Sequence, residues 1–389
     1  MMMKKVRVCI NGITENSEIR GPVRYIYELV AHLDTTRYEI FLLAGEWQRK
    51  VYGPLEDRVE VLYFDISLSK ASRSWFFIMS MPKLLRTMAI DVYHITFTDL
   101  LPAMRWRAKI VSTIHDSAEF VVPERYSRFQ AKARRLISKL QAHGSDAVIT
   151  VSEASKADLV KYLGIDPARV TVTHLGASTS GSIRVPEARK APGDEIPYVL
   201  YVGVLENAKN VDRLVAAYAG LAGDLRERFH LYLVGRKANA YARIRELIEE
   251  HKIAKQIKIF GYVEEQALNT LYAGATLFAY LSEYEGFGLP VLEAMQRGLP
   301  VLTANRSSLP EVAGSAAMVV ETDVPSITKG LDELLRSEDL RRRFAELAIP
   351  HAASFDWNRT ARQTEQVYLR ALFQGSSPPS DFHDGPSGN

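Results

Sequence analysis

Two kinds of hydrophobic pattern alternate along the first half of the chain. Short apolar runs rich in β-branched residues are typical of buried strands, and longer segments with apolar residues every three or four positions are typical of amphipathic helices. The apolar runs are VRVCIN (6–11), YEIFLLAG (38–45), KIVSTIHD (109–116) and DAVITVS (146–152), and the helical segments include VRYIYELVAHL (23–33) and ADLVKYLGI (157–165). This alternation predicts βαβ units and a parallel sheet.

A second alternating series follows residue 195. Its expected strands are 198–205, 229–235, 255–261, 275–282 and 299–304, with helices at 210–223 and 241–252. Between the two series, residues 177–197 are rich in Ser, Pro, Gly and charge without periodicity, which is typical of an interdomain linker. We therefore predict an α/β protein with two doubly wound, Rossmann-like domains that face a cleft.

The expected domains are residues 1–180 and 195–356. A helical segment at 357–373 comes after the second series is complete, so we expect it to cross back onto the first domain. The tail, 374–389, is polar and proline-rich and is predicted to be disordered. The length supports two domains, because 389 residues exceed the ~250–300 at which single cores stop growing.

Composition narrows the class of protein. With 47% hydrophobic and 24% charged residues, the chain has no apolar run near the ~20 residues that span a bilayer. The segment MMMKKVRVCINGI has too few apolar residues for a signal peptide, and Cys9 is the single cysteine, so no internal disulfide can form. We therefore expect a cytoplasmic protein.

Positive charge is concentrated in the first half of the chain. The net charge is +3, but residues 1–190 carry +8 and the remainder −5. Residues 124–140 place six basic side chains beside Tyr126, Phe129, Leu136 and Ile137 at helical spacing, and residues 74–90 add apolar side chains with two further cations. Two interpretations stay open: peripheral contact with anionic lipid on the inner face of the plasma membrane, or an ordinary amphipathic helix with a solvated basic face. Nucleic acid fits poorly, since the charge is diluted and aromatic residues are not interleaved with it.

The segment YLSEYEGFGLPVLEAMQRG (280–298) carries the most specific chemistry. A strand pattern leads into a helix with Pro290 in its first turn and Gly298 at its end, so the junction lies at the carboxyl edge of a sheet, where such folds bind ligands. Gly286 and Gly288 let the backbone approach a phosphate at the helix start. Glu285 and Glu293 flank this turn, and ionised carboxylates accept hydrogen bonds from sugar hydroxyls. The combination fits a nucleotide sugar.

At this segment the chain resembles the retaining glycosyltransferases of family four, also called group 1, which have the GT-B fold. The resemblance extends from GPVRYIYEL through VSTIHD, VITVSEASKADLVKYLGI and YVGVLENAKNVDRLVAAY to FDWNRTARQTEQVYLRAL. It implies that Glu285 contacts hydroxyls of the transferred sugar and that Glu293 binds the ribose. Backbone N–H groups near Gly286, Phe287, Gly288 and Leu289 would then hold the diphosphate.

The resemblance also implies roles for residues outside this segment. Lys209 in ENAKN matches the lysine that neutralises the leaving diphosphate. The usual preceding arginine is Ala208 here, which removes one positive charge from the donor site. Either Arg236 or Arg24 supplies this charge instead, or donor binding is weaker. His115 would reach the donor sugar, and we expect Asp116 to cap the next segment or orient His115.

Two further loops complete the implied donor site. Gly21 would bring backbone close to the phosphates, although Val23 stands where the family more often has glycine. On the nucleoside side, backbone amides near Gly261, Tyr262 and Val263 would read the base while Arg236 approaches it. Any strand-to-helix turn offers such amides.

The reaction implied by the resemblance is retaining transfer of a hexose or deoxyhexose. The acceptor enters on the face that the phosphate leaves, and a phosphate oxygen takes its proton. The chain has no Asp-x-Asp motif, so we expect a metal-independent enzyme without a cofactor, whose co-substrate is a nucleotide sugar, here GDP-mannose. The expected acceptor is a glycan or lipid-linked glycan in surface polysaccharide or lipopolysaccharide biosynthesis. The alternatives are a nucleotide-sugar epimerase and a non-catalytic subunit that binds a nucleotide sugar.

Overall fold

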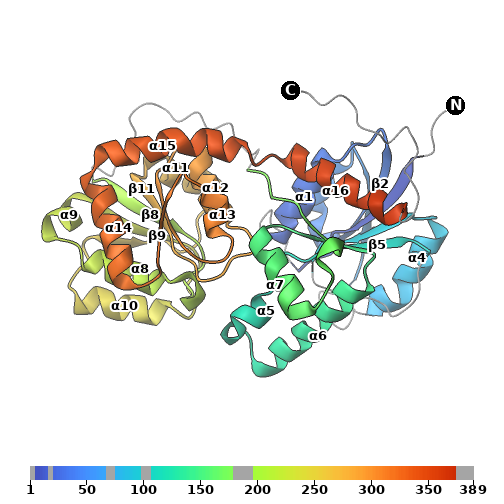
Figure 1. Ribbon diagram of the computed structural model, residues 1–389, viewed down its shortest axis with the longest axis horizontal. Helices are drawn as coiled ribbons and strands as arrows, with labels where there is room; N and C mark the ends of the chain where they lie inside the picture. The colour runs from blue at the N-terminus through green and yellow to red at the C-terminus, as the bar shows by residue number, and fades with distance from the viewer. Residues whose placement is uncertain (1–4, 16–20, 67–74, 98–106, 178–195, 374–389) are drawn as a thin grey trace. The chain divides into compact units, whose positions relative to one another are not determined.

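The computed structural model describes residues 5–15, 21–66, 75–97, 107–177 and 196–373, and most of the expected linker and the whole expected tail (374–389) lie outside this part. The chain divides into two compact units (Figure 1). The first comprises residues 1–176 and 357–389, and the second comprises residues 177–356.

The first unit contains a parallel sheet with the strand order β3-β2-β1-β4-β5-β6-β7. All six neighbouring pairs are parallel, in agreement with the alternating pattern. The strands are β1 Val6–Asn11, β2 Tyr38–Gly45, β3 Glu60–Phe64, β4 Val92–Ile95, β5 Lys109–Thr113, β6 Ala147–Thr150 and β7 Val170–Val172. The helices are α1 Pro22–His32, α2 Arg49–Tyr52, α4 Met81–Thr87, α5 Ala118–Val121, α6 Arg128–Gly144, α7 Glu153–Leu163 and α16 Trp357–Leu372.

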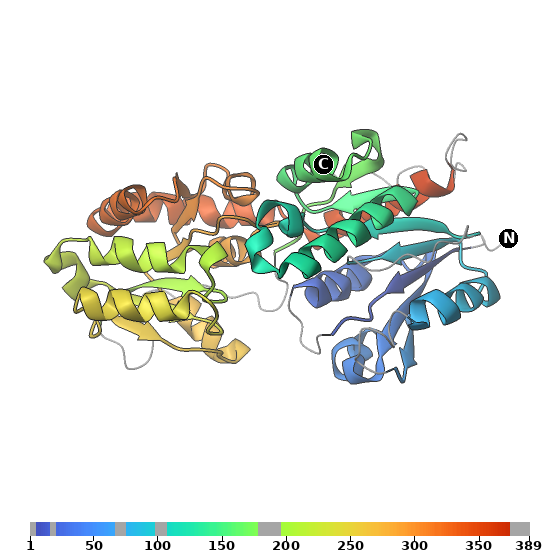
Figure 2. The same ribbon diagram turned by 90° about the horizontal axis from the view of Figure 1, so that it is seen from below.

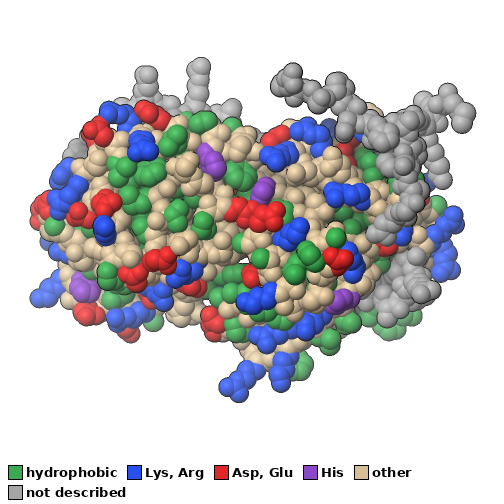
Figure 3. Space-filling view, viewed as in Figure 1, with side chains coloured by type: hydrophobic (Ala, Val, Ile, Leu, Met, Phe, Trp, Pro, Cys, Tyr) green, Lys and Arg blue, Asp and Glu red, His purple; other side chains and the backbone are tan. Residues whose placement is uncertain are grey.

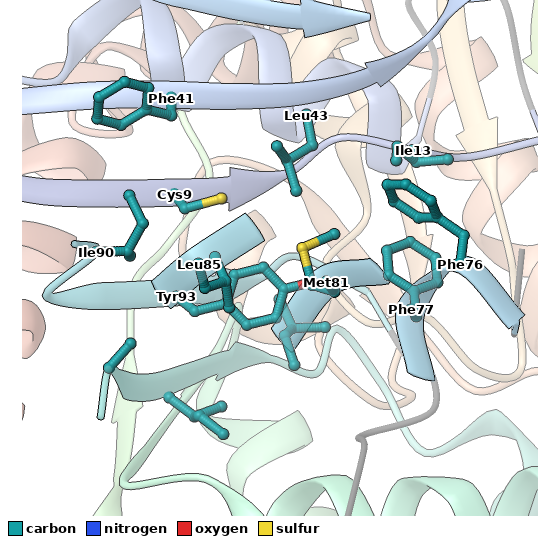
Figure 4. Packing of buried hydrophobic residues seen from close by; sticks show 13 residues of the cluster. Cys9, Ile13, Phe41, Leu43, Phe76, Phe77, Met81, Leu85, Ile90 and Tyr93 are labelled. Atoms are coloured by element: carbon teal, nitrogen blue, oxygen red, sulfur yellow. The ribbon is translucent and has the colours of Figure 1, made fainter. Parts of the chain in front are cut away.

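One face of this sheet packs against α4 and the π-helical turn Phe76–Ser80 that precedes it. Figure 4 shows Cys9 on β1 and Leu43 on β2 beside Met81 and the rings of Phe76 and Phe77. These side chains are almost entirely shielded from water. The apolar residues of the central strands therefore form the core, and the carboxyl ends of the strands are left for polar residues.

Helix α16 completes the first unit although it is the last helix of the described chain. It contacts α1 and β5 (Figure 1), and Trp357 and Tyr368 are buried there. The hydroxyl of Tyr368 lies 2.7 Å from Nδ1 of His94 on β4, and the backbone N–H of Asp34 donates to Oε1 of Glu365 at 2.8 Å. Polar contacts as well as apolar ones thus attach α16.

The second unit contains a parallel sheet with the strand order β10-β9-β8-β11-β12-β13 and helices on both faces (Figure 2). Its strands are β8 Tyr198–Val202, β9 His230–Val234, β10 Ile257–Ile259, β11 Leu277–Tyr280, β12 Val301–Ala304 and β13 Met318–Val320. Its helices are α8 Val211–Ala219, α9 Gly223–Arg228, α10 Tyr241–Glu250, α11 Glu265–Gly274, α12 Leu289–Gln296, α13 Leu309–Ala313, α14 Val324–Arg336 and α15 Glu338–Ala353. The predicted α/β class with two parallel sheets is confirmed.

The carboxyl group of Glu365 makes the stability of the first unit depend on pH. Burial is the main cause that raises its pKa from the ordinary value to about 7, and the hydrogen bond from the N–H of Asp34 opposes this effect. A pKa that is higher in the folded state than in the unfolded chain lowers stability as the pH rises toward and past 7. We expect Glu365→Gln to raise the melting temperature relative to wild type at pH 8 and to give a smaller advantage at pH 5.

Thermal unfolding followed by circular dichroism at the two pH values measures this difference. The control is Glu346→Gln, because Glu346 is exposed on α15. An advantage of Glu365→Gln that is equal at both pH values would contradict the assignment.

Candidate functional site

The predicted strand-to-helix junction is formed by β11, a loop at residues 281–288, and α12. Gly288 precedes the helix with φ of 109°, in the left-handed region, and a Cβ at this position would lie 2.8 Å from Cδ2 of Leu309. Gly298 follows the end of α12 with φ of 67°. Both glycines therefore occupy conformations that L side chains rarely adopt.

Glu285 lies in this loop as an ion pair with Lys209. Its Oε1 contacts Nζ of Lys209 and accepts a hydrogen bond from the hydroxyl of Tyr280 at 2.6 Å. The side chains of Lys209 and Glu285 are only 12% and 15% exposed. Burial alone would raise the pKa of Glu285, but the charge of Lys209 and the hydrogen bonds outweigh it and hold the pKa below its ordinary value. The carboxylate is therefore ionised at neutral pH.

The loop that carries Lys209 is attached to the loop that carries Glu285. Asn210 adopts φ of 52° at the start of α8, and its Nδ2 donates to the carbonyl of Leu281 at 2.8 Å. In return, the N–H of Glu283 donates to the carbonyl of Ala208 at 2.9 Å. The carboxyl ends of β8 and β11 are thus cross-linked, which fixes the ion pair in place.

Residues before α13 support the same loop from another direction. The hydroxyl of Ser308 lies 2.7 Å from the carbonyl oxygen of Phe287 and 3.0 Å from that of Glu285, and the hydroxyl of Ser307 donates to the carbonyl of Glu285 at 2.7 Å. Arg306 binds the carboxylate of Glu283 at 3.1 Å. Sequence reasoning missed these residues. The Ser-Ser pair before Leu309 and Pro310 indicates a helix start, but the sequence does not show which backbone carbonyls the two hydroxyl groups bind.

Glu293 lies in the same unit, within α12. It is half-buried, and its Oε2 accepts from the hydroxyl of Tyr272 on α11 at 3.4 Å. Arg297 stacks over the ring of Tyr272 at 4.6 Å and donates to the carbonyl of Glu293 at 2.9 Å. The carboxylate is therefore positioned by α11 as well as by its own helix.

The predicted nucleoside-binding residues follow β9 and β10. Arg236 is exposed, and its carbonyl accepts from the N–H of Leu205 at 2.9 Å. The N–H of Gly235 donates to the carbonyl of Gly261 at 2.8 Å, and Tyr262 beside it is 58% exposed, with Val263 half-buried. Backbone hydrogen bonds therefore connect the loops after β8, β9 and β10 at one edge of the sheet.

His115 belongs to the first unit and lies two residues after the end of β5. Its Nε2 lies 2.9 Å from the carbonyl of Thr96, so Nε2 carries a proton and donates it. Burial is the main cause that lowers the pKa of His115, against the opposing effects of the Thr96 carbonyl and the Asp116 charge. Asp116 caps α5, because its Oδ1 accepts from the N–H of Ala118 at 2.9 Å. The ring is therefore neutral at physiological pH, with Nδ1 as an acceptor.

A buried polar chain that the sequence did not reveal lies beside His115. The edge of the Tyr25 ring faces the imidazole at 4.8 Å, and the hydroxyl of Tyr25 lies 2.9 Å from Oγ1 of Thr113. Nε2 of His94 contacts the same Oγ1 at 2.8 Å, and burial lowers the pKa of His94 to about 3. This chain connects His115 to Tyr368 on α16 through neutral groups.

Gly21 also belongs to the first unit. It caps the start of α1 with φ of 50° and is exposed, and Arg24 is half-buried one turn later. Residues 17–20 of the predicted loop lie outside the described part of the chain. The other predicted donor residues belong to the second unit.

The described residues contain neither a candidate metal cluster nor a membrane-spanning helix. Within that part of the chain, no three His, Cys, Asp or Glu side chains are grouped so that they could hold a metal ion. None of the helices in the described ranges is long and apolar enough to cross a bilayer.

Comparisons with known proteins assign the family. Residues 186–349 match the model of the glycosyl transferases group 1, and residues 19–180 match that of the glycosyltransferase family 4. The O-antigen chain mannosyltransferase B of Escherichia coli is 30% identical over 67% of this chain and 70% of its own length. The chain belongs to the group 1, family 4 glycosyltransferases.

Two further proteins are similar to this chain. The serotype-specific mannosyltransferase WbdA of Escherichia coli is 28% identical over 71% of this chain, which spans only 35% of the length of WbdA. The crystal structure of WaaG, a glycosyltransferase involved in lipopolysaccharide biosynthesis, has a TM-score of 0.70 at 19% identity and covers 93% of this chain and 99% of its own. The predictions of a family-four glycosyltransferase and of the GT-B fold are confirmed.

In this glycosyltransferase the Lys209–Glu285 pair can be tested through stability. Lys209→Met leaves a mostly buried carboxylate without its counter-charge, so we expect it to lower the free energy of unfolding by about 2 kcal/mol at pH 8. Adding Glu285→Gln should restore most of the loss, because the double variant buries no charge. The loss of unfolding free energy in Lys209→Met should become smaller toward pH 5, where the unpaired carboxyl group of Glu285 takes up a proton.

Urea unfolding of the single and double variants measures these differences. Lys329→Met is the matched control, because the Lys329 side chain is 79% exposed. A double variant that is as unstable as Lys209→Met would show that Lys209 does not act through Glu285.

Proposed function

We propose that this glycosyltransferase moves mannose from GDP-mannose to a growing glycan of a surface polysaccharide, with retention of configuration and without a metal ion. The observation that supports this most directly is the ion pair of Lys209 and Glu285 beside the start of α12. The mannosyltransferase relatives support the choice of sugar.

The second unit offers both kinds of group that a nucleotide sugar needs. The N-terminal end of α12 favours a phosphate through its helix dipole, and Lys209 adds a positive charge. One N–H of Lys209 binds Glu285, which leaves its ammonium group with donors for phosphate oxygens. The ionised carboxylate of Glu285 accepts hydrogen bonds from sugar hydroxyls, and Glu293 does the same for the ribose.

The proposed reaction breaks the bond between the anomeric carbon and the diphosphate oxygen, which leaves with the bonding electron pair. The acceptor hydroxyl oxygen bonds to the same carbon on the same face, and its proton passes to the departing phosphate oxygen. Lys209 and the helix dipole stabilise the negative charge that develops on this oxygen. In the first unit, the neutral ring of His115 accepts a hydrogen bond from a sugar hydroxyl at Nδ1.

A transfer assay tests this proposal. We expect the purified protein to release GDP from GDP-mannose and to mannosylate a lipid-linked glycan prepared from cells that make surface polysaccharide. Glu285→Gln should reduce kcat by a factor of about 100, the scale at which one transition-state contact acts. Proton NMR of the product should show the anomeric configuration of the donor.

Each part of the proposal has its own contradicting result. Transfer from a UDP-sugar or ADP-sugar but not from GDP-mannose would overturn the donor, and an inverted product would overturn retention. Loss of activity with a chelator that manganese restores would overturn metal independence. Isomerisation of the donor without transfer would indicate an epimerase, and binding without turnover would indicate a non-catalytic subunit.

We also propose that α6 attaches the first unit to an anionic lipid surface on the cytoplasmic side, where a lipid-linked acceptor is carried. Phe129, Leu136 and Leu140 are 81%, 59% and 54% exposed. Their spacing puts them on one face of the helix, together with the exposed Lys132 and Lys139. The opposite face, which includes Ala131, Ser138 and Ala142, is buried. Figure 3 shows basic side chains gathered with apolar ones over the region of α6.

This arrangement differs from an ordinary amphipathic helix, because three large apolar side chains are on the exposed face rather than in the core. Anionic lipid matches both the cations and the apolar groups of that face. Helix α6 begins at Ser127, whose side chain accepts from the N–H of Gln130, so the helix is already formed without lipid.

Vesicle flotation tests the attachment. We expect wild type to float with vesicles that contain anionic phospholipid and not with neutral ones. The triple variant Phe129→Ser, Leu136→Ser, Leu140→Ser should lose at least about tenfold in affinity, because each apolar side chain contributes roughly 1.5–3 kcal/mol when buried. Leu347→Ser with Ile349→Ser on α15 is the control for exposed apolar residues. Equal flotation of the triple variant and wild type would contradict the role of α6.

A further inference from the structure

We infer that Ser307 and Ser308 are positioning residues of the 281–288 loop, and that Ser308 aims the backbone N–H of Gly288 at the donor diphosphate. This inference rests on the proposed function of that loop. The two serines lie between β12 and α13 and touch the loop only through backbone carbonyl oxygens. They therefore act on the direction of the peptide groups and not on the sugar itself.

The geometry of the trans peptide makes this connection. All peptide bonds in the described residues are trans, and in a trans peptide the carbonyl of one residue points opposite to the N–H of the next. Ser307 donates to the carbonyl of Glu285 at 2.7 Å and so fixes the peptide group between Glu285 and Gly286. The single hydroxyl proton of Ser308 serves the nearer carbonyl, that of Phe287 at 2.7 Å rather than that of Glu285 at 3.0 Å. The N–H of Gly288 therefore points away from Ser308.

Burial explains why hydroxyl groups are needed at this place. Ser308 is fully buried and Phe287 is 4% exposed, so water cannot readily replace a lost donor. A buried carbonyl without a partner is costly, and the loop would rotate its peptide groups to find another one. Such a rotation would carry the N–H groups away from the phosphate position.

The backbone of Ser307 is a second sign of a constrained position. Its φ of 51° lies in the left-handed region, which residues other than glycine rarely adopt. This conformation accompanies the placement of two consecutive hydroxyl groups on two carbonyls of one loop, those of Glu285 and Phe287. The loop is thus oriented before any donor binds, and binding does not have to order it.

The test compares binding of a nucleoside diphosphate with binding of its nucleoside. GDP, UDP and ADP, each paired with its own nucleoside, are titrated into the full-length protein by calorimetry. For the pair that binds wild type, we expect Ser308→Ala to weaken diphosphate binding about tenfold, the scale of one lost hydrogen bond, and to leave nucleoside binding unchanged. Ser307→Ala should have a smaller effect, because Ser308 still donates to the carbonyl of Phe287, which fixes the direction of the Gly288 N–H.

The matched control is Thr328→Val in the second unit. The hydroxyl of Thr328 also donates to a backbone carbonyl, the one of Val324, at 2.8 Å. This variant should change neither affinity. Equal loss of diphosphate and nucleoside affinity in Ser308→Ala would show a merely structural effect and overturn the inference, as would no loss at all. Failure of wild type to bind any of the three diphosphates would instead overturn the proposed function.

Discussion

A carboxylate that is removed from water needs a counter-charge, and the arrangement of the second unit follows from this requirement at Glu285. Its partner Lys209 lies 76 positions earlier in the chain, at the end of a different strand. To keep the two together, the loops after β8 and β11 are bound to each other through Asn210 and the carbonyl of Ala208. The hydrogen bonds between the two loops therefore hold the charged pair together.

Among the elements that the sequence predicted best are two strands whose side chains are almost all buried. The run VRVCIN coincides with β1, and YEIFLLAG coincides with β2, because a central strand of a parallel sheet is apolar on both faces. The pattern missed β3, β7 and β13, which are edge strands and are partly exposed. It also missed β4, although this strand is central and buried. It also placed the start of α6 too early, because it overlooked the capping pair of Ser127 and Gln130.

At the candidate site, too, residues within one segment could be predicted from the sequence, and contacts between distant segments could not. Glu285, Gly288 and Glu293 belong to one continuous segment, so their chemistry and spacing were visible in the sequence. Ser308 and Asn210 were not recognised, because their importance depends on which loops meet in three dimensions. An asparagine or serine before a helix predicts a cap, and only the structure shows that these side chains bind a neighbouring loop instead.

The position of α16 at the end of the described chain has a consequence for synthesis on the ribosome. Residues 1–176 leave the ribosome first, but the buried Trp357 and Tyr368 that complete their core arrive only after the whole second unit has been made. The ring of Trp357 packs so closely on Gly176 that a Cβ there would overlap it. The nascent first unit therefore lacks part of its core until α16 has been made, and the second unit is the earlier of the two to have all of its residues.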